Sequence, residues 1–261
     1  MEFAALASGS TGNCYLVTAD GTSILIDAGI SLRRITAALK GLGTEMCDVS
    51  AVLVTHEHKD HIGALPMLAK YCHIPIYATD GTADAIAESC PQASGDLRRI
   101  KTGEELHFGT MTVRAFRTSH DSAQSVGYQI THEGRRLVFM TDTGVVTPQA
   151  VRAAKGCEAA VLEANHDVNM LRYGPYTYAL MQRIFSQQGH LSNDDCGAFA
   201  AWLAGEGTKR IVLAHLSKEN NSPRAALETV GAALVGAGIR PGVDVQLDAA
   251  PMLGLLGPFE V

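Results

Sequence analysis

The sequence predicts an α+β fold in which two mixed β-sheets lie face to face between layers of helices, an αββα sandwich. Short apolar runs follow one another as a meander in the first half of the chain and alternate with helical segments in the second half. This order fits two sheets between helices better than a doubly wound parallel sheet. No G-x-G-x-x-G follows the first strand and no Pro-, Gly- or Ser-rich linker divides the chain, so we expect a single domain over residues 1–261.

The individual elements follow from local patterns. Strands are predicted where short apolar or alternating runs are bounded by turn residues, at 3–7, 14–18, 24–26, 51–54, 74–77, 111–117, 125–130, 136–140, 159–162, 209–214, 243–247 and 252–255. Helices are predicted where apolar residues recur at helical spacing before a glycine or proline, at 31–41, 62–71, 80–89, 148–154, 175–188, 193–205 and 223–235. The basic segment 98–101 is expected to be a solvated edge.

Composition narrows the class of protein. With 46% hydrophobic and 18% charged residues, the chain can bury a substantial core. Its net charge of −6 argues against general coating of nucleic acid, although bound divalent ions would add positive charge at one site. The six cysteines form no C-x-x-C pair, which indicates reduced, mostly buried residues of a cytoplasmic protein. Neither a signal peptide nor a membrane span is expected, and the sequence does not indicate an oligomeric state.

The most informative stretch is T-H-E-H-K-D-H, from Thr55 to His61, between an apolar run and a predicted helix. A loop between a strand and a helix directs its side chains into one region. His56 and His58 can bind one cation, and Asp60 and His61 can bind a second. Imidazole with carboxylate suits zinc, manganese or iron better than calcium or magnesium. The alternative is a polar turn that binds no metal.

Three further predicted strands each run into a residue that can bind a metal: His120, Asp142 and His215. We expect such residues, at the ends of successive strands, to converge at one edge of the sheets. The alternatives are structural histidines and, for Asp142, a simple turn residue.

Other residues are weaker candidates for metal binding. His107 and His132 lie in segments that look like exposed hairpins, and His73 precedes a predicted core strand and is expected to be structural. Asp27 ends the third predicted strand. It either orients a metal-binding histidine or caps the helix that begins near Ser31.

The H-x-H-x-D-H motif after an apolar strand resembles the signature of the metallo-β-lactamase superfamily. The resemblance implies an αββα sandwich with a hydrolytic site for one or two metals. It divides the seven candidate ligands into His56, His58 and His120 for one metal and Asp60, His61 and His215 for the other, with Asp142 bridging both. Such a site keeps a net positive charge beside a bridging hydroxide and would attract an anionic substrate.

Glu163 ends a predicted strand, and His190 opens a predicted helix. Their surroundings, E-A-N-H and G-H-L-S-N, resemble elements of tRNase Z-type phosphodiesterases. The resemblance implies that Glu163 orients His190, which protonates the leaving oxygen and so contributes on the order of 10²–10⁴-fold. The alternative for His190 is a helix-start residue held by Ser192 or Asn193. Three roles stay open for His166: a contact to phosphate, an alternative metal ligand, or a neighbour of Glu163.

Longer strings over most of the chain resemble the WalJ/YycJ-type branch of this superfamily. They include L-A-S-G-S-T-G-N-C at 6–14, T-D-T-G at 141–144 and A-H-L-S-K-E-N-N at 214–221. The resemblance implies a cytoplasmic bacterial metallohydrolase with 5′→3′ exonuclease activity on DNA. Polar residues of the first and last strings are candidate substrate contacts, with plain polar turns as the alternative: Ser10, Asn13, Ser217, Lys218, Asn220 and Asn221.

Together these patterns predict a two-metal phosphodiesterase that uses a metal-bridging hydroxide as nucleophile, Asp60 and Glu163 as supporting catalytic residues and His190 as general acid. The expected cofactors are two divalent ions, zinc, manganese or iron, and the expected substrate is nucleic acid, DNA before RNA. A thioester or lactone hydrolase of the glyoxalase II type is the alternative, because its leaving groups need less protonation. A non-catalytic binding module is disfavoured by the complete ligand set.

Overall fold

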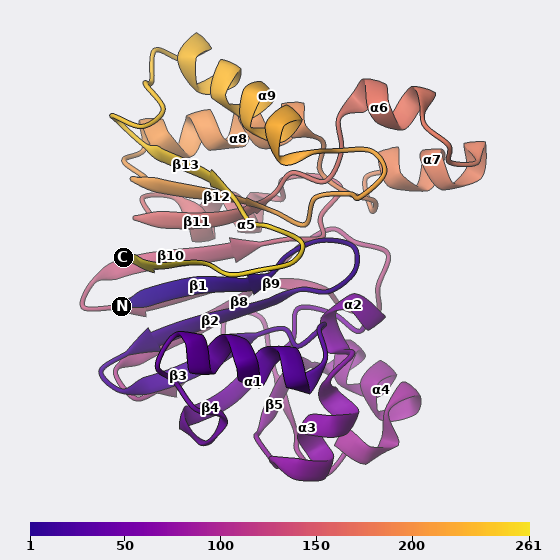
Figure 1. Ribbon diagram of the computed structural model, residues 1–261, viewed down its shortest axis with the longest axis vertical. Coiled ribbons are helices and arrows are strands. Elements are labelled where there is room, and N and C mark those ends of the chain that lie inside the picture. Colours follow the sequence, from indigo (N-terminus) through magenta and orange to yellow (C-terminus); the bar gives the residue numbers. More distant parts are fainter.

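The computed structural model describes residues 1–261 and confirms the predicted class, because two seven-stranded sheets lie between helices (Figure 1). The strands of the first sheet are β1 (Glu2–Ala7), β2 (Cys14–Ala19), β3 (Thr22–Ile26), β4 (Val49–Leu53), β5 (Ile76–Thr79), β6 (Leu97–Ile100) and β14 (Leu256–Glu260). Those of the second are β7 (Glu105–Phe108), β8 (Met111–Arg117), β9 (Val126–His132), β10 (Arg135–Met140), β11 (Ala159–Glu163), β12 (Arg210–Ala214) and β13 (Gln246–Ala249).

Both sheets combine an antiparallel part with a parallel part. The spatial orders are β14-β1-β2-β3-β4-β5-β6 and β13-β12-β11-β10-β9-β8-β7. The run from β3 to β6 is parallel, and so is the run from β10 to β13. Parallel neighbours end at the same edge of a sheet, and the candidate site lies at that edge.

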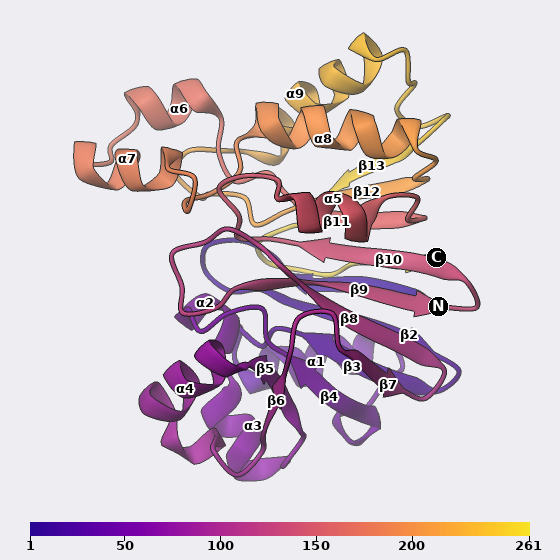
Figure 2. The same ribbon diagram turned by 180° about the vertical axis from the view of Figure 1, so that it is seen from behind.

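The helices lie on the outer faces of the two sheets and at one end of them. On the first sheet are α1 (Leu32–Gly41), α3 (Leu65–Tyr71) and α4 (Asp80–Ser89), and on the second are α5 (Pro148–Ala154), α8 (Asn193–Gly205) and α9 (Pro223–Gly236). Three short helices, α2 (Lys59–Ile62), α6 (Val168–Tyr173) and α7 (Tyr178–Phe185), lie at the same end of the sandwich in both views (Figures 1 and 2). None of the helices combines the length and apolar character that crossing a membrane requires.

Three buried apolar clusters hold the four layers together. The cluster between the sheets contains Tyr15 and Phe139, whose rings pack 5.4 Å apart. Ile24 belongs to this cluster and Leu25 to the one beneath the first helical layer. Successive strand residues point to opposite faces, so β3 contributes to two clusters at once. The third cluster joins the second sheet to its helices.

Several predicted elements are corrected. The helix predicted at 62–71 is two helices, because α2 starts at Lys59 and the chain turns at Gly63 before α3. The helix predicted at 175–188 is shorter, and α6 precedes it. The last two strands lie further along the chain than predicted, at 246–249 and 256–260. Two short strands, β6 and β7, were not predicted, because their charged residues interrupt the alternation of apolar and polar residues that is typical of a strand.

Two smaller expectations are also corrected. His132 is not an exposed hairpin residue: it is buried at the end of β9, and its Nε2 lies 3.0 Å from Asp20 Oδ2. His190 does not open a helix, because α8 starts at Asn193 with Ser192 as its N-cap. Four of the six cysteines are buried, as expected.

Candidate metal centre

The loop between β4 and α2 carries the H-x-H-x-D-H motif. β4 is buried except at one residue, and the chain leaves it at Val54. His56 and His58 lie in the loop, and Asp60 and His61 lie in α2. The rings of His56 and His61 are 4.1 Å apart, so loop and helix direct their side chains to one point.

The other candidate ligands come from the second sheet. His120 follows β8, Asp142 follows β10 and His215 follows β12. Asp142 and His215 have positive φ angles of 54° and 52°. Residues other than glycine seldom adopt this left-handed conformation, which concentrates at functional sites. Here it turns both side chains toward the end of the sandwich.

The structure brings the seven candidate ligands together. One donor atom from each of His56, His58 and His120 lies within 4.8 Å of the others, and so does one from each of Asp60, His61 and His215. Asp142 lies between the two groups: its Oδ2 is 3.3 Å from His61 Nε2, and its Oδ1 is 3.8 Å from His120 Nε2.

A cation fits this arrangement. His56 Nε2, His215 Nδ1 and Asp142 Oδ2 are buried and make no hydrogen bond, although the last two atoms lie only 3.2 Å apart. Buried polar atoms without a partner are rare and cost stability, so three in one place indicate that a ligand completes them. Burial raises the pKa of Asp142 to about 6, and a bound cation would keep this carboxylate charged.

Neighbouring residues fix the orientation of the histidines. Asp27 Oδ2 lies 2.8 Å from His61 Nδ1, and Thr55 donates to Asp27 through both its N–H and its hydroxyl. Asp27 therefore orients a histidine, while Ser31 caps α1. The Gly189 carbonyl lies 3.0 Å from His120 Nδ1. Sequence reasoning missed the role of Thr55, because its hydroxyl reaches Asp27 across 28 positions of the chain. It missed the Gly189 carbonyl because a backbone atom leaves no sequence signal.

Glu163 and His190 form a pair beside the metal centre. Glu163 is fully buried, and its Oε2 accepts hydrogen bonds from the N–H groups of Thr143 and Leu191. Its Oε1 lies 2.7 Å from His190 Nδ1. Burial raises the pKa of Glu163 to about 8 and lowers the pKa of His190. The His190 ring stands 5.0 Å from that of His120, so the pair lies directly beside a candidate ligand.

The candidate substrate contacts divide into free and occupied side chains. Ser10 and Lys218 are exposed and free. Asn13 is buried, and its amide lies 3.1 Å from His61 Nε2, so it contacts the metal centre. The Asn221 amide bonds to Asn193 and Ala164, which makes it a structural link between the loop and α8.

Three other candidates are buried. Ser217 Oγ accepts from the N–H of Asn220, which ties the loop to itself. His166 and Asn220 make no hydrogen bond through their side chains. His166 packs against Phe185 of α7 with the rings 5.3 Å apart, and neither it nor Asn220 belongs to a group of candidate metal ligands.

Comparisons with known proteins agree with this fold. A family profile, the β-lactamase superfamily domain, matches residues 22–216. The exodeoxyribonuclease YycJ of Bacillus anthracis is 39% identical over 248 residues, which cover 95% of this chain and 94% of that protein. The exodeoxyribonuclease WalJ of Streptococcus pneumoniae is 35% identical over 254 residues, or 96% and 94% of the two chains. The metallo-β-lactamase-fold protein YhfI from Bacillus subtilis superposes with a TM-score of 0.74 over 98% of both chains, at 16% identity.

An αββα sandwich with clustered histidines and aspartates at one edge, in a chain that matches this profile, defines a metal-dependent hydrolase that binds divalent metal. The chain belongs to the metallo-β-lactamase superfamily and, within it, to the branch that contains YycJ and WalJ.

Proposed function

We propose that this protein is a two-metal phosphodiesterase that removes nucleotides from the 5′ end of DNA. Two relatives named exodeoxyribonuclease, which match nearly the whole chain, support nucleic acid as the substrate and DNA before RNA. The observation that carries the proposal is the Glu163–His190 pair, at 2.7 Å, beside the candidate ligands. Hydrolysis of a phosphodiester needs a proton for its leaving oxygen, whereas hydrolysis of a thioester or lactone needs it less.

The residues have distinct roles in this proposal. His56, His58 and His120 would hold one divalent ion and Asp60, His61 and His215 the other, with Asp142 between them; zinc, manganese or iron suits these donors. When bound, the ions supply Lewis-acid stabilisation and a nucleophile derived from water. His190 Nδ1 faces Glu163 and leaves Nε2 to donate a proton to the leaving oxygen. The bond between phosphorus and the leaving oxygen breaks as an oxygen from water bonds to phosphorus. The water gives up a proton to solvent, and the pair regains from solvent the proton that it donated.

The test is a nuclease assay on end-labelled DNA with Mn²⁺ or Zn²⁺, with and without a chelator. We expect cleavage that needs metal and starts from the 5′ end. His190→Ala is expected to keep both metals, measured by elemental analysis, and to lose on the order of 10²–10⁴-fold in turnover.

Three results would count against the proposal. Full activity of His190→Ala would rule out His190 as the general acid. Hydrolysis of thioesters but not of DNA would favour the thioester or lactone hydrolase. The absence of chelator-sensitive cleavage of any nucleic acid would refute the proposed nuclease function.

A further inference from the structure

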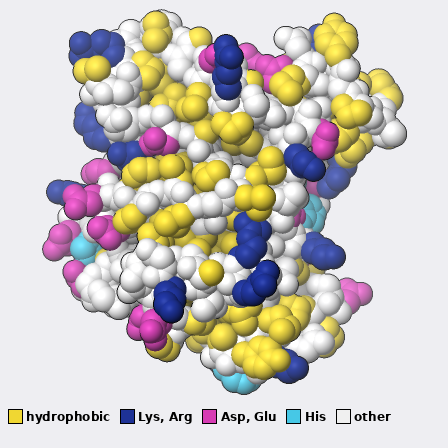
Figure 3. Space-filling view, in the orientation of Figure 1, with side chains coloured by type: hydrophobic (Ala, Val, Ile, Leu, Met, Phe, Trp, Pro, Cys, Tyr) yellow, Lys and Arg dark blue, Asp and Glu magenta, His cyan; other side chains and the backbone are white.

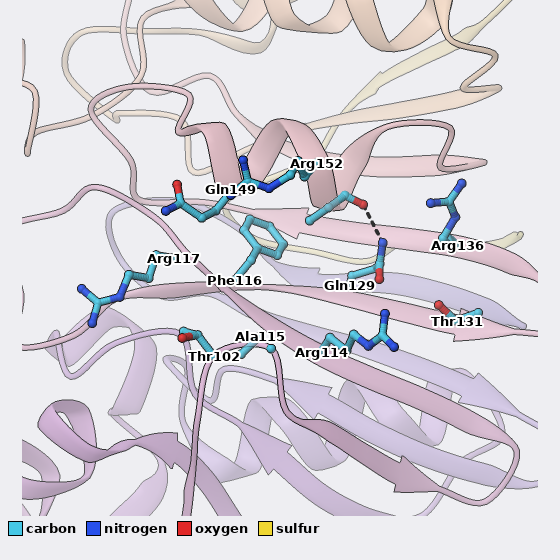
Figure 4. A pocket seen from close by; sticks show the side chains of 12 residues that line it. Thr102, Arg114, Ala115, Phe116, Arg117, Gln129, Thr131, Arg136, Gln149 and Arg152 are labelled. Atoms are coloured by element: carbon cyan, nitrogen blue, oxygen red, sulfur yellow. Dashed lines mark hydrogen bonds between the residues drawn. The ribbon is translucent and has the colours of Figure 1, made fainter.

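A cavity lined by arginines lies on the outer face of the second sheet, away from the metal centre. It measures about 820 Å³, and its lining includes Arg114, Arg117, Arg136 and Arg152 but no acidic residue (Figure 4). We call it the arginine groove. The whole chain carries a net charge of −6, whereas the four arginines make the surroundings of this cavity positively charged. On the face seen in Figure 3, basic side chains lie among hydrophobic and other uncharged atoms.

The sheet register explains why these side chains share a face. Arg114 on β8 pairs with Gln129 on β9, and Thr131 on β9 pairs with Arg136 on β10. Positions directly opposite each other point to the same side of a sheet. Helix α5 adds Arg152 from above, so two layers of the molecule contribute guanidinium groups.

Two of the arginines are free to bind a ligand. Arg117 and Arg152 are exposed and form no ion pair with any acidic residue. Arg114 pairs with Glu105, but its side chain is 53% exposed, so a ligand can compete for it. Arg136 donates to the Gly156 carbonyl at 2.7 Å through one nitrogen and keeps other donors.

Strand β8 connects the groove to a candidate metal ligand. Arg117 ends β8, and His120 follows three residues later. The hydroxyl of Thr147 donates to the Arg117 carbonyl, which ties β8 to the segment between Asp142 and α5. From Arg114 to His120 the chain spans at most about 20 Å at ~3.3 Å per residue. At ~3.4 Å per nucleotide, the spacing along one strand of a duplex, this corresponds to at most about six nucleotides.

From this placement we propose that the arginine groove binds the phosphate backbone of the nucleic-acid substrate, beyond the nucleotides that reach the metals. The inference rests on the proposed nuclease function. Guanidinium groups match phosphate oxygens with two parallel hydrogen bonds, and the amides of Gln129 and Gln149 suit the same oxygens. Backbone contacts carry no sequence information, so the groove holds the strand and does not select its sequence.

The test uses Arg114→Gln combined with Arg152→Gln, because both positions are remote from the metal ligands. For a single-stranded 20-mer we expect kcat/KM to fall roughly tenfold and the slope of log binding constant against log salt to decrease by about 1.4, or ~0.7 for each lost phosphate contact. Cleavage of a dinucleotide or of bis(p-nitrophenyl) phosphate is expected to stay unchanged. Arg152→Gln alone, which breaks no ion pair, should give part of the effect.

The matched control is Arg224→Gln combined with Arg240→Gln, which removes the same charge outside the groove and should behave as the unchanged protein. Binding of labelled single-stranded DNA is also measured by anisotropy without turnover. Groove-dependent binding without any cleavage would support the groove while refuting the nuclease function. Equal binding by both double variants would overturn the groove, as would an equal loss on long and short substrates. Displacement by polyglutamate but not by DNA would assign the groove to an acidic protein partner and overturn it too.

Discussion

At the scale of single residues, His61 depends on a carboxylate that does not itself reach the metal position. Asp27 holds His61 Nδ1 at 2.8 Å and accepts two hydrogen bonds from Thr55. A carboxylate in this position fixes the orientation of the imidazole and increases its basicity. Asp27 makes this contact in a left-handed backbone conformation, with φ 60°, which is unfavourable for most residues other than glycine.

Asp27→Asn is therefore expected to weaken metal binding by about 10–100-fold without unfolding the protein. Asparagine tolerates positive φ and has the same shape, so the change is mainly one of charge. Metal affinity is measured by competition with a chromophoric chelator. Asp20→Asn is the control, because Asp20 also has positive φ, at 46°, but lies outside the metal centre. Equal metal affinity of both variants would contradict the role of Asp27.

His166 gives a prediction for pH. Burial lowers its pKa to about 4, from a model-peptide value of 6.5. Above pH 6.5 the histidine is neutral in both folded and unfolded chains. As the pH falls toward 4, the unfolded chain takes up the proton first, so the folded state loses stability.

His166→Phe should remove this loss. Relative to the unchanged protein, we expect the variant to gain about 1.4 kcal/mol between pH 7.5 and pH 5.5, at ~1.36 kcal/mol per pKa unit. At pH 7.5 it should be at least as stable, because it removes two buried nitrogens that have no hydrogen bond. Urea unfolding at both pH values measures the difference. A constant difference would show that His166 does not titrate in this way.

The sequence is most informative for residues that follow strands. It placed His120, Asp142 and His215 together because each stands at the end of an apolar run, and the structure brings them to one edge. It was less informative for Asn221 and His132. Their hydrogen-bond partners, Asn193 and Asp20, lie 28 and 112 positions away in the chain. A local pattern does not contain such contacts.

At the scale of elements, the segment that carries the candidate ligands His56 to His61 is held by close packing of backbones. The N–H of Asn13 donates to the Asp60 carbonyl, and the N–H of Gly29 donates to the Asn13 carbonyl. A Cβ built on Gly29 would lie 1.6 Å from the Asp60 carbonyl oxygen. The junction between β3 and α1 therefore requires glycine, because α2 passes directly over it.

Gly29→Ala is expected to displace Asp60 and His61 and to reduce metal content well below that of the unchanged protein. Gly41→Ala is the control: it lies in α1 with no atom within 4 Å of its added Cβ. That variant should keep its metals and gain about 0.4–1 kcal/mol of stability. Elemental analysis and urea unfolding of both variants test this. Full metal content in Gly29→Ala would mean that the backbone relaxes without moving the ligands.

Elements with strong local patterns were predicted well, and those fixed by distant pairing were not. α4, α5, α8 and β8 have the predicted bounds. β14 lies further along the chain than predicted because its position follows from pairing with β1, at the opposite end of the sequence. Apolar residues continue through 252–256, so the sequence alone offers no reason to start the strand late.

At the scale of the whole molecule, the candidate ligands come from both halves of the sandwich. His56, His58, Asp60 and His61 are attached to the first sheet through β4 and α2. His120, Asp142 and His215 follow strands of the second sheet. Both groups that are proposed to hold an ion, His56/His58/His120 and Asp60/His61/His215, contain residues from both sheets, and a bound ion would link them. The expectation of one domain over 1–261 stays a prediction, but such a link would make the halves unfold together.

Metal removal should therefore destabilise the whole sandwich and not only the loop. A ligand present at 1,000 times its Kd stabilises the folded state by about 4 kcal/mol, so chelation is expected to lower the free energy of unfolding by this order. Hydrogen exchange should then increase in segments 55–62 and 118–120 of the first and second halves alike. His190→Ala should lose the same stability on chelation, because His190 is not a candidate ligand in the proposal. If exchange increases in one half only, the ions do not join the two sheets.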